Sequence, residues 1–476
     1  MNSLRALTMT VIFAVLLSGA LLTRVSASEF AGGNGLARSP YIIETEQHLR
    51  LLANYTGTRH RDTRFILAND ILLSANWTPI SGIFYGRLDG NNHTISNLNI
   101  TVNSAAGNAY AGLFTALGGA VSNLTVYGNI TVSANILGWD DTAYAGGIAG
   151  RLERSARVEN VVSNVRINVT IPPGAAGRVE AGGAIGGSYG GVIRRSSSAG
   201  EISVNARNTE ARVHVGGLVG VSDLRSEVSN SFSYANLEAF GGNRNLVGGL
   251  VGFVAANSQV SKSYASGTVI GAYAITQNNV GGLVGQVIHN GTVEQSFSTG
   301  NVMARGAYPV YFHAVGGVAG SMYYGASISD TFAVGSVTAV GGLSSMGGIV
   351  GRLGTNVTIR NSYSAVSMDV SQTMQVQDII TVIGTARGER EQVINSGGFT
   401  DDGLYLFYFF DNSAASTITP VTSAEIQRID IFRQFNWDVR NRWTILDDSE
   451  FNLPVLRGVF MEVQREFPKL RHLSSN

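Results

Sequence analysis

The residue types that carry out most enzyme chemistry are carboxylates, histidines, serines and cysteines, and their spacing in this chain can be examined first. Neighbouring acids occur at three places: Asp140/Asp141, Asp401/Asp402 and Asp447/Asp448. A pair of acids is what glycoside hydrolysis requires. However, consecutive residues of a strand point to opposite faces of a sheet, so adjacency alone does not place two carboxylates in one site. A polysaccharide-cutting enzyme therefore stays an alternative and not the main prediction.

Metal and thiol chemistry have no support in the sequence. The seven histidines form no His-Glu-x-x-His motif and no closely spaced pair, which argues against a zinc peptidase of that type. The chain contains no cysteine, which excludes disulfides, thiolate metal ligands and thiol catalysis. We therefore predict no catalytic residue, no metal and no cofactor.

Length and charge narrow the class of protein. The chain has 476 residues, which is too long for one compact core and indicates several domains or an elongated repeat array. Lys plus Arg and Asp plus Glu balance at 33 each, and charged residues make up only 14%. This balance gives no electrostatic reason to expect a nucleic acid or an anionic membrane as partner.

A short glycine-rich phrase recurs along the chain and defines the repeat. The phrase GGLVG occurs three times, and close variants precede and follow it. Aligning its second glycine gives steps of 31–36 residues. Glycine allows positive φ or the close approach of two backbones, so we predict that these are structural glycines at a chain corner. They are Gly147, Gly183, Gly217, Gly249, Gly282, Gly317 and Gly348, with Gly112 as an earlier member.

The rest of the repeat keeps a fixed register. A β-branched residue follows about eleven positions after the aligned glycine, and a small hydroxyl residue follows three positions later. The next position is aromatic in five successive repeats: Phe232, Tyr264, Phe297, Phe332 and Tyr363. Short β segments broken by turns, stacked coil upon coil, predict an all-β parallel β-solenoid of nine or ten coils, about 45 Å long at ~4.8 Å per coil. The aromatic residues then face the core, which we favour, or face outward as a stacking strip for glycans.

Length variation between repeats gathers on one edge of this solenoid. The segment before each aligned glycine varies in length and carries aromatic residues, and the variable edge of a repeat protein is often its binding face. The alternative is that these segments are tolerated loops. The predicted binding residues are Trp139, Tyr144, Tyr308, Tyr311 and Phe312.

The repeat pattern, GG followed by two aliphatic residues and Gly, then Val-x-x-Ser-aromatic, resembles the GLUG repeat of bacterial exported and cell-surface proteins. Residues 32–55, 65–100 and 422–458 are similar to the usual entry and exit segments of such proteins. The resemblance implies a right-handed parallel β-helix and an adhesin-like role. It supplies no catalytic residues to transfer.

The ends of the chain complete the predicted domain organisation. An apolar run from Ala6 to Leu22, followed by small residues, predicts a secretory signal peptide at 1–27. We then expect an N-terminal cap at 28–64, the β-solenoid at 65–398, a C-terminal cap at 399–458 and a tail at 459–476. Each cap is expected to be short and helical or irregular: a helix capped by Thr45 and running to Tyr55, and a helix at 424–432 capped by Ser423, with Trp437 and Trp443 closing the end.

These observations together predict a secreted, extracellular or cell-surface protein with no membrane span in the mature chain. The predicted function is that of a non-enzymatic, adhesin-like β-solenoid that binds extracellular glycans or host or matrix proteins. A polysaccharide-active enzyme and a structural spacer of the envelope remain the alternatives.

Overall fold

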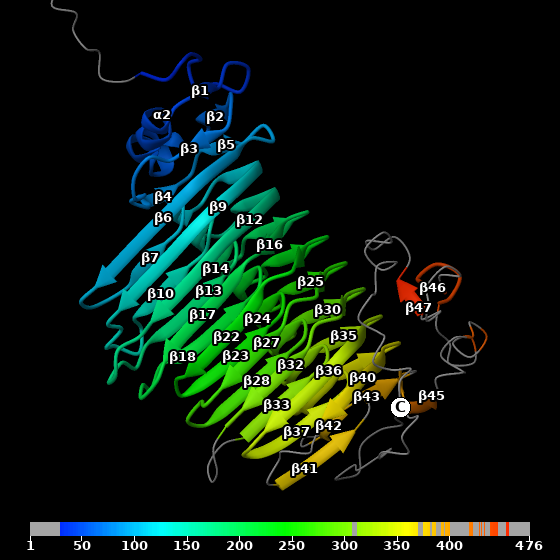
Figure 1. Cartoon of the computed structure of the whole chain (residues 1–476). Coiled ribbons are helices and arrows are strands. Elements are labelled where there is room, and N and C mark those ends of the chain that lie inside the picture. The colour runs from blue at the N-terminus through cyan, green and yellow to red at the C-terminus, as the bar shows by residue number, and fades with distance from the viewer. Residues whose placement is uncertain are drawn as a thin grey trace, which may run out of the picture.

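The computed structural model describes residues 29–306 and 312–369. It also describes shorter stretches at 375–380, 383–386, 392–394, 396–399, 418–421, 438–445 and 454–456, together with residues 428, 430 and 433. The chain forms a parallel β-solenoid whose coils are stacked in sequence order, so that the colour in Figure 1 changes steadily from one end of the rod to the other. The predicted all-β solenoid is thus confirmed.

Three parallel sheets form the walls of the solenoid, and two of them receive one strand from each coil. The nine-stranded sheet consists of β7 (Ala109–Ala111), β10 (Thr142–Ala145), β13 (Arg178–Gly182), β18 (Arg212–Gly216), β23 (Arg244–Gly248), β28 (Gln277–Gly281), β33 (Phe312–Gly316), β37 (Leu343–Gly347) and β41 (Gln375–Ile380). The ten-stranded sheet consists of β4 (Ile80–Phe84), β8 (Phe114–Leu117), β11 (Ala149–Leu152), β14 (Ile185–Tyr189), β19 (Val219–Asp223), β24 (Val251–Val254), β29 (Val284–Val287), β34 (Ala319–Met322), β38 (Val350–Leu353) and β42 (Ile383–Ala386).

The third wall, here called the long sheet, has 26 strands among the described residues because most coils contribute two or three short strands to it. Its first half contains β1 (Tyr41–Ile43), β2 (Arg64–Leu67), β3 (Ile71–Leu72), β5 (Arg87–Asp89), β6 (Thr94–Ser104), β9 (Ala120–Ala134), β12 (Arg157–Thr170), β15 (Val192–Arg194), β16 (Ser197–Ala199), β17 (Glu201–Ala206), β20 (Glu227–Ser229), β21 (Phe232–Ser233) and β22 (Asn236–Gly241). Its second half contains β25 (Gln259–Ser261), β26 (Tyr264–Ala265), β27 (Val269–Ala272), β30 (Thr292–Glu294), β31 (Phe297–Ser298), β32 (Val302–Arg305), β35 (Ser327–Ser329), β36 (Phe332–Val340), β39 (Thr358–Arg360), β40 (Tyr363–Asp369), β43 (Gln392–Ile394), β44 (Ser396–Phe399) and β45 (Ile418–Val421).

The register between coils follows the repeat. Val228 pairs with Ile193 on one side and with Val260 on the other, and the same column continues through Val293 and Ile328. These side chains are buried, as are the other aliphatic residues that alternate with outward polar residues along each strand. Stacking therefore places like residues above one another and makes one continuous apolar core along the rod.

The glycine phrase forms the corner between the nine-stranded and ten-stranded sheets. A Cβ added to Gly217 would lie 2.0 Å from the carbonyl oxygen of Gly249 and 2.1 Å from Ser233 Oγ, so no larger residue fits. The same clash with the next coil recurs at Gly249 and Gly282. None of these three glycines has φ in the left-handed region. Of the two reasons expected for glycine here, close backbone approach is the one that applies.

A second corner, within the long sheet, carries the positive φ angles. The residue just before the hydroxyl position adopts φ between 47° and 52° in six successive coils, at Arg195, Asn230, Lys262, Gln295, Asp330 and Asn361. The hydroxyl then bonds to the preceding coil: Ser231 Oγ accepts from Ser196 N at 3.2 Å, and Ser263 Oγ accepts from Ser231 N at 3.2 Å. These bonds offset the left-handed conformation, which is uncommon for residues other than glycine.

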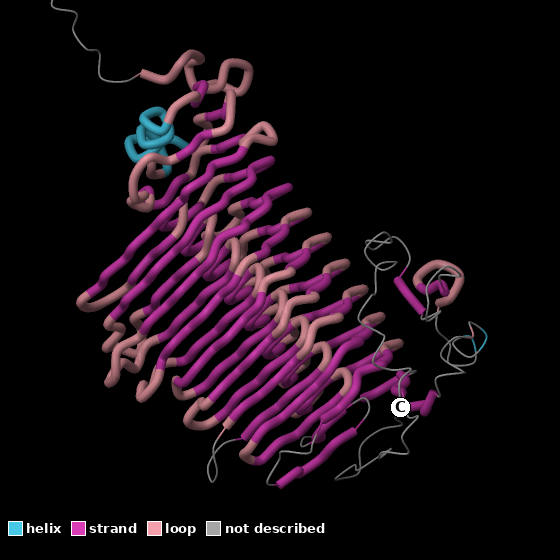
Figure 2. Tube along the Cα trace, viewed as in Figure 1, coloured by secondary structure: helices cyan, strands magenta, loops and turns pink. Residues whose placement is uncertain are grey.

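The N-terminal end is closed by a short helical segment, visible in cyan in Figure 2. Helix α2 (Glu46–Leu51) begins as expected after Thr45, whose Oγ1 accepts a hydrogen bond from His48 N at 3.2 Å. Two 3₁₀ turns follow, η1 (Leu52–Tyr55) and η2 (Thr58–His60). Leu49 and Leu52 are fully buried against the first coils. The cap covers an open end of the core that would otherwise expose unpaired strands.

At the other end, β46 (Trp443–Ile445) and β47 (Pro454–Leu456) form an antiparallel pair. The predicted cap helix at 424–432 lies almost wholly outside the described residues, as do the signal peptide and Trp437.

Candidate binding face at the glycine corner

The glycine corner bends the wall so that the outer faces of two sheets meet. Gly216 and Gly220 stand at outward positions on either side of the corner. A Cβ on Gly216 would lie 1.9 Å from the Val219 carbonyl oxygen, and a Cβ on Gly220 would lie 2.7 Å from Ala181 N. Farther from the corner the outward positions carry side chains. We call these outward side chains of the nine- and ten-stranded sheets the corner face.

Three arginines form a row along the corner face. Arg178, Arg212 and Arg244 begin β13, β18 and β23 and are direct register partners on adjacent strands. Parallel neighbours are about 4.8 Å apart, so the row places three like charges side by side. The Nε atom of each is buried without a hydrogen-bond partner among the described residues. Burial and the neighbouring charge of Arg212 lower the pKa of Arg244.

Glu180 lies one row closer to the corner and is only 1% exposed. The Tyr189 hydroxyl donates to this carboxylate, with its oxygen 2.6 Å from Oε1 and 2.7 Å from Oε2. Burial raises the pKa of Glu180 to about 7, although Tyr189, Arg178 and Arg151 act in the opposite direction. Glu180 therefore changes its charge near neutral pH.

His214 occupies the same row on the next strand, where it is stacked on Phe253 with ring centroids 5.3 Å apart. Burial, followed by the charges of Arg244, Arg178 and Arg212, lowers the pKa of His214 to about 3. The ring is thus neutral at physiological pH. Its Nδ1 and both polar atoms of the Asn279 side chain have no hydrogen-bond partner among the described residues.

Aromatic rings and guanidinium groups lie beside the row that contains Glu180 and His214. Tyr110 and Tyr144 are stacked at 5.0 Å with an interplanar angle of 10°. Cation–π contacts place Arg151 4.7 Å from the Tyr189 ring centroid and Arg212 5.5 Å from that of Trp139. Such a surface offers flat apolar rings and charged hydrogen-bond donors together.

The predicted binding residues fall on or beside this face where they are described. Trp139 is 58% exposed at the edge of the face, whereas Tyr144 is buried within it. Phe312 is half-buried with the Arg352 guanidinium 4.7 Å from its ring centroid. Tyr308 and Tyr311 lie outside the described residues.

The arginine row was not predicted from the sequence, although a signal for it was present. Each of Arg178, Arg212 and Arg244 stands five residues before an aligned glycine. Glu180 and His214 share the position three residues before it, and no chemistry was predicted there.

The aromatic ladder does not lie in the solenoid interior, so the favoured core placement was wrong. Phe232 to Tyr363 stack in register, with adjacent centroids 4.7–5.3 Å apart and nearly parallel rings. Tyr234 shares the face of Phe232 and is 44% exposed, while Ser233 between them points inward to Gly217. The ladder is therefore on the outer face. It is still no open stacking strip, because every ring from Tyr264 onward is buried.

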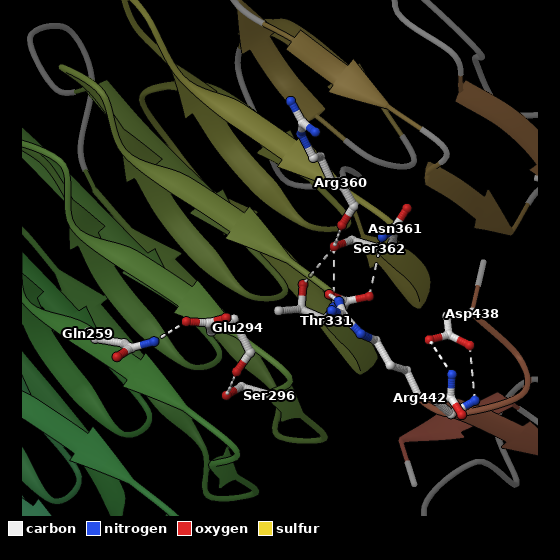
Figure 3. Close-up of polar contacts among 11 residues, drawn as sticks. Gln259, Glu294, Ser296, Thr331, Arg360, Asn361, Ser362, Asp438 and Arg442 are labelled. Atoms are coloured by element: carbon white, nitrogen blue, oxygen red, sulfur yellow. Dashed lines mark hydrogen bonds and ion pairs between the residues drawn. The ribbon is translucent and has the colours of Figure 1, made fainter. Parts of the chain in front are cut away.

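The C-terminal segment covers one end of this ladder. Trp443 is fully buried, with its ring centroid 6.1 Å from that of Phe332 and 5.6 Å from that of Tyr363. Beside it, Arg442 forms an ion pair with Asp330, next to Thr331 and Asn361 (Figure 3). Trp443 thus packs against the side of the solenoid, which corrects the expectation that it closes the end.

Where they are described, the serine and acid motifs do not form a second site. A Gly-x-Ser-x-Gly sequence at 186–190 resembles a nucleophile turn, but Ser188 is fully buried and its Oγ lies 2.9 Å from Ser226 Oγ. Asp141 accepts from Gly138 N within a loop, and the other two acid pairs lie outside the described residues. Among the described residues no three His, Cys, Asp or Glu side chains are grouped as metal ligands.

Comparison with known proteins agrees with the repeat. A model of the GLUG motif matches residues 243–270 and 276–303, and the chain therefore carries GLUG repeats. A protein named as a Gly-rich membrane protein of Evansella cellulosilytica is 38% identical over 122 residues, which is 23% of this chain and 13% of that protein. Halomucin of Haloquadratum walsbyi is 37% identical over 126 residues, which is 24% of this chain and 1% of that protein. The chain thus matches a small part of the length of either relative.

One solved structure, described as an immunoglobulin A1 protease from Bacteroides ovatus, overlaps 90% of this chain and 95% of its own. The TM-score is 0.39 and the identity 17%, so the likeness says nothing about activity. In the part of the chain that is described, no helix has the length and apolar character needed to span a bilayer.

Proposed function

We propose that this protein is an exported, non-enzymatic β-solenoid of the cell surface or its surroundings that binds extracellular glycans through the corner face. The observation that carries the proposal is the combination of the row Arg178, Arg212 and Arg244 with the exposed ring of Trp139, which Arg212 contacts. Sugar rings present apolar C–H faces and hydroxyl groups, and this surface offers partners for both.

The GLUG repeats and the likeness to a named membrane protein support a surface location, as does the expected signal peptide. Binding of the mature chain, from Ser28 to Asn476, to an array of soluble glycans tests the proposal. Saturable binding that Trp139→Ala weakens is the expected result. Absence of binding to any glycan would favour a structural spacer instead.

A polysaccharide-active enzyme is the second candidate because of Glu180, whose pKa near 7 suits proton transfer. Two features weigh against it: the carboxylate is 1% exposed, and Tyr189 already holds both of its oxygens. Release of new reducing ends from any glycan, lost in Glu180→Gln, would establish the enzyme.

A further inference from the structure

The ligand class of the corner face can be inferred from the ion pairing of its arginines, provided that the face binds glycans as proposed above. No ion pair among the described residues includes Arg178, Arg212 or Arg244. In contrast, Arg194 and Arg195 on the long sheet pair with Glu227 and Glu159. Seven arginines elsewhere in the described residues thus form ion pairs, whereas the three of this row form none.

Acids on adjoining segments are engaged in other contacts. Asp141 accepts a hydrogen bond from Gly138 N, and Glu210 accepts one from Asn243 Nδ2. Glu180 accepts from Tyr189, and its charge interacts with that of Arg178 on the same strand. Arg244 Nη2 donates to Gln286 Oε1 over a long distance of 3.5 Å. The row therefore keeps most of its donor capacity for a partner from outside the chain.

Like charges on adjacent strands destabilise a sheet, and partial burial strengthens the repulsion. The lowered pKa of Arg244 reflects both effects. A stack of three such residues in register is relieved when anionic groups of a partner lie along it. Guanidinium groups are suited to this task because they bind carboxylate and sulfate groups through two hydrogen bonds.

The spacing limits the form of the partner. The arginines lie along the rod at the coil repeat of about 4.8 Å, so the matching anions must recur along an extended chain. Trp139 contacts Arg212 at 5.5 Å, and Tyr144 lies one strand before Arg178, so aromatic rings flank the charges. A linear polymer of sugars that bear acid groups has both features.

We propose that the corner face binds an acidic polysaccharide, whose carboxylate or sulfate groups pair with Arg178, Arg212 and Arg244 while its sugar rings contact the exposed ring of Trp139.

The test uses the mature chain and four probes: polygalacturonate, heparin, dextran and single-stranded poly(dT). We expect saturable binding to polygalacturonate, heparin or both, which distinguishes carboxylate from sulfate as the anion. Each of Arg178→Gln, Arg212→Gln and Arg244→Gln should weaken that affinity about tenfold, corresponding to about 1.4 kcal/mol. Arg360→Gln, an exposed arginine of β39 on the long sheet, should leave it unchanged.

The outcomes separate the two proposals. Equal binding of dextran, with arginine variants that bind like the wild type, would overturn the acidic ligand while leaving glycan binding intact. Equal affinity for poly(dT) would show attraction to any polyanion and would also overturn it. Failure of every glycan to bind would remove both proposals. Because the three substitutions relieve like-charge repulsion, thermal melting should show folded variants with unchanged or higher stability.

Discussion

The Tyr189 hydroxyl donates a hydrogen bond to the buried Glu180 carboxylate across the glycine corner, from β14 to β13. Arg178 and Arg151 are the cations whose charges act on this carboxylate. Tyr144 and Asp223 also lie near enough to interact, and the neutral ring of His214 occupies the same row on the next strand. Burial outweighs the stabilising contacts and keeps the pKa near 7. This pair gives the corner face a charge that depends on pH.

The free energy of unfolding should fall as pH rises from about 4.5 to about 7, the range over which Glu180 holds its proton in the folded state only. Its pKa in the folded protein is about 7 against 4.5 in the unfolded chain, so the folded state binds more protons between these values. The loss begins above about pH 4.5 and is complete above about pH 7, and it amounts to about 3 kcal/mol. Glu180→Gln should abolish this part of the pH dependence and melt higher than wild type at pH 8. Equal melting temperatures at pH 8 would show that Glu180 ionises freely.

The same titration should change ligand binding. Protonation of Glu180 below pH 7 removes a negative charge beside Arg178, so affinity for an acidic polysaccharide should rise from pH 8 to pH 6. His214 stays neutral across this interval because its pKa is about 3. Isothermal titration at the two pH values measures the change. Glu180→Gln should bind equally at both, and a pH dependence that survives in this variant would assign it to another group.

The corner glycines should not tolerate a side chain. Gly217→Ala places Cβ 2.0 Å from a carbonyl oxygen of the next coil, which is backbone and cannot move aside. We expect a loss of at least about 3 kcal/mol or failure to fold. Gly107→Ala is the control, because nothing lies within 4 Å and only its φ of 76° opposes the change. Its loss should be about 1 kcal/mol. Chemical denaturation compares the two, and equal losses would refute the steric explanation.

The hydroxyl residue that recurs from coil to coil, such as Ser231, should stabilise the second corner, the one within the long sheet. Ser231→Ala removes the acceptor of Ser196 N and the donor to the Ser229 carbonyl, both within a buried corner. The unsatisfied backbone groups should lower the free energy of unfolding by about 1–3 kcal/mol. Ser133→Ala, at an exposed position of β9, provides the comparison and should be nearly neutral.

The C-terminal segment should detach when its anchor is removed. Arg442→Ala removes the ion-pair partner of the Asp330 carboxylate, which is 1% exposed and keeps the hydrogen bond from Asn361 Nδ2, so the loss should be about 1–3 kcal/mol. Release would expose the Phe332 and Tyr363 rings beneath Trp443. Limited proteolysis should then cut the segment faster, and Trp443 fluorescence should shift to the red. Arg440→Ala, which is exposed, should change neither; a protected segment in Arg442→Ala would contradict the anchoring role.

The fold could be predicted from the sequence because stacking repeats the same physical demand in each coil. The Val228 column, the hydroxyl at Ser231 and the glycine at Gly217 each recur at a fixed offset, and each has one place in a solenoid. The outward turn of the Phe232 ladder was not predictable, because a left-handed residue, Asn230, bends the strand just before it and alternation cannot be counted across the bend.

The candidate site was harder to predict than the fold. Trp139 and Tyr144 stood out as aromatic residues in a variable segment, whereas Arg212 appeared to be an ordinary surface charge. Arg212 becomes part of a row of charges only through its two register partners, which are 34 and 32 residues away in the sequence. The concave bend at the glycine corner, which buries Glu180 and shifts its pKa, likewise has no sequence signal apart from the glycines themselves.

The in-register stacking gives each coil one outward position on the corner face, five residues before its corner glycine. Arginine, glutamine, phenylalanine and leucine occupy it in different coils on the same corner, at Arg244, Gln277, Phe312 and Leu343. A single substitution there changes the outward side chain of one coil only. The outer surface of the rod can therefore change one coil at a time. A change in the chemistry of a partner polymer can then be matched by single substitutions and needs no new fold.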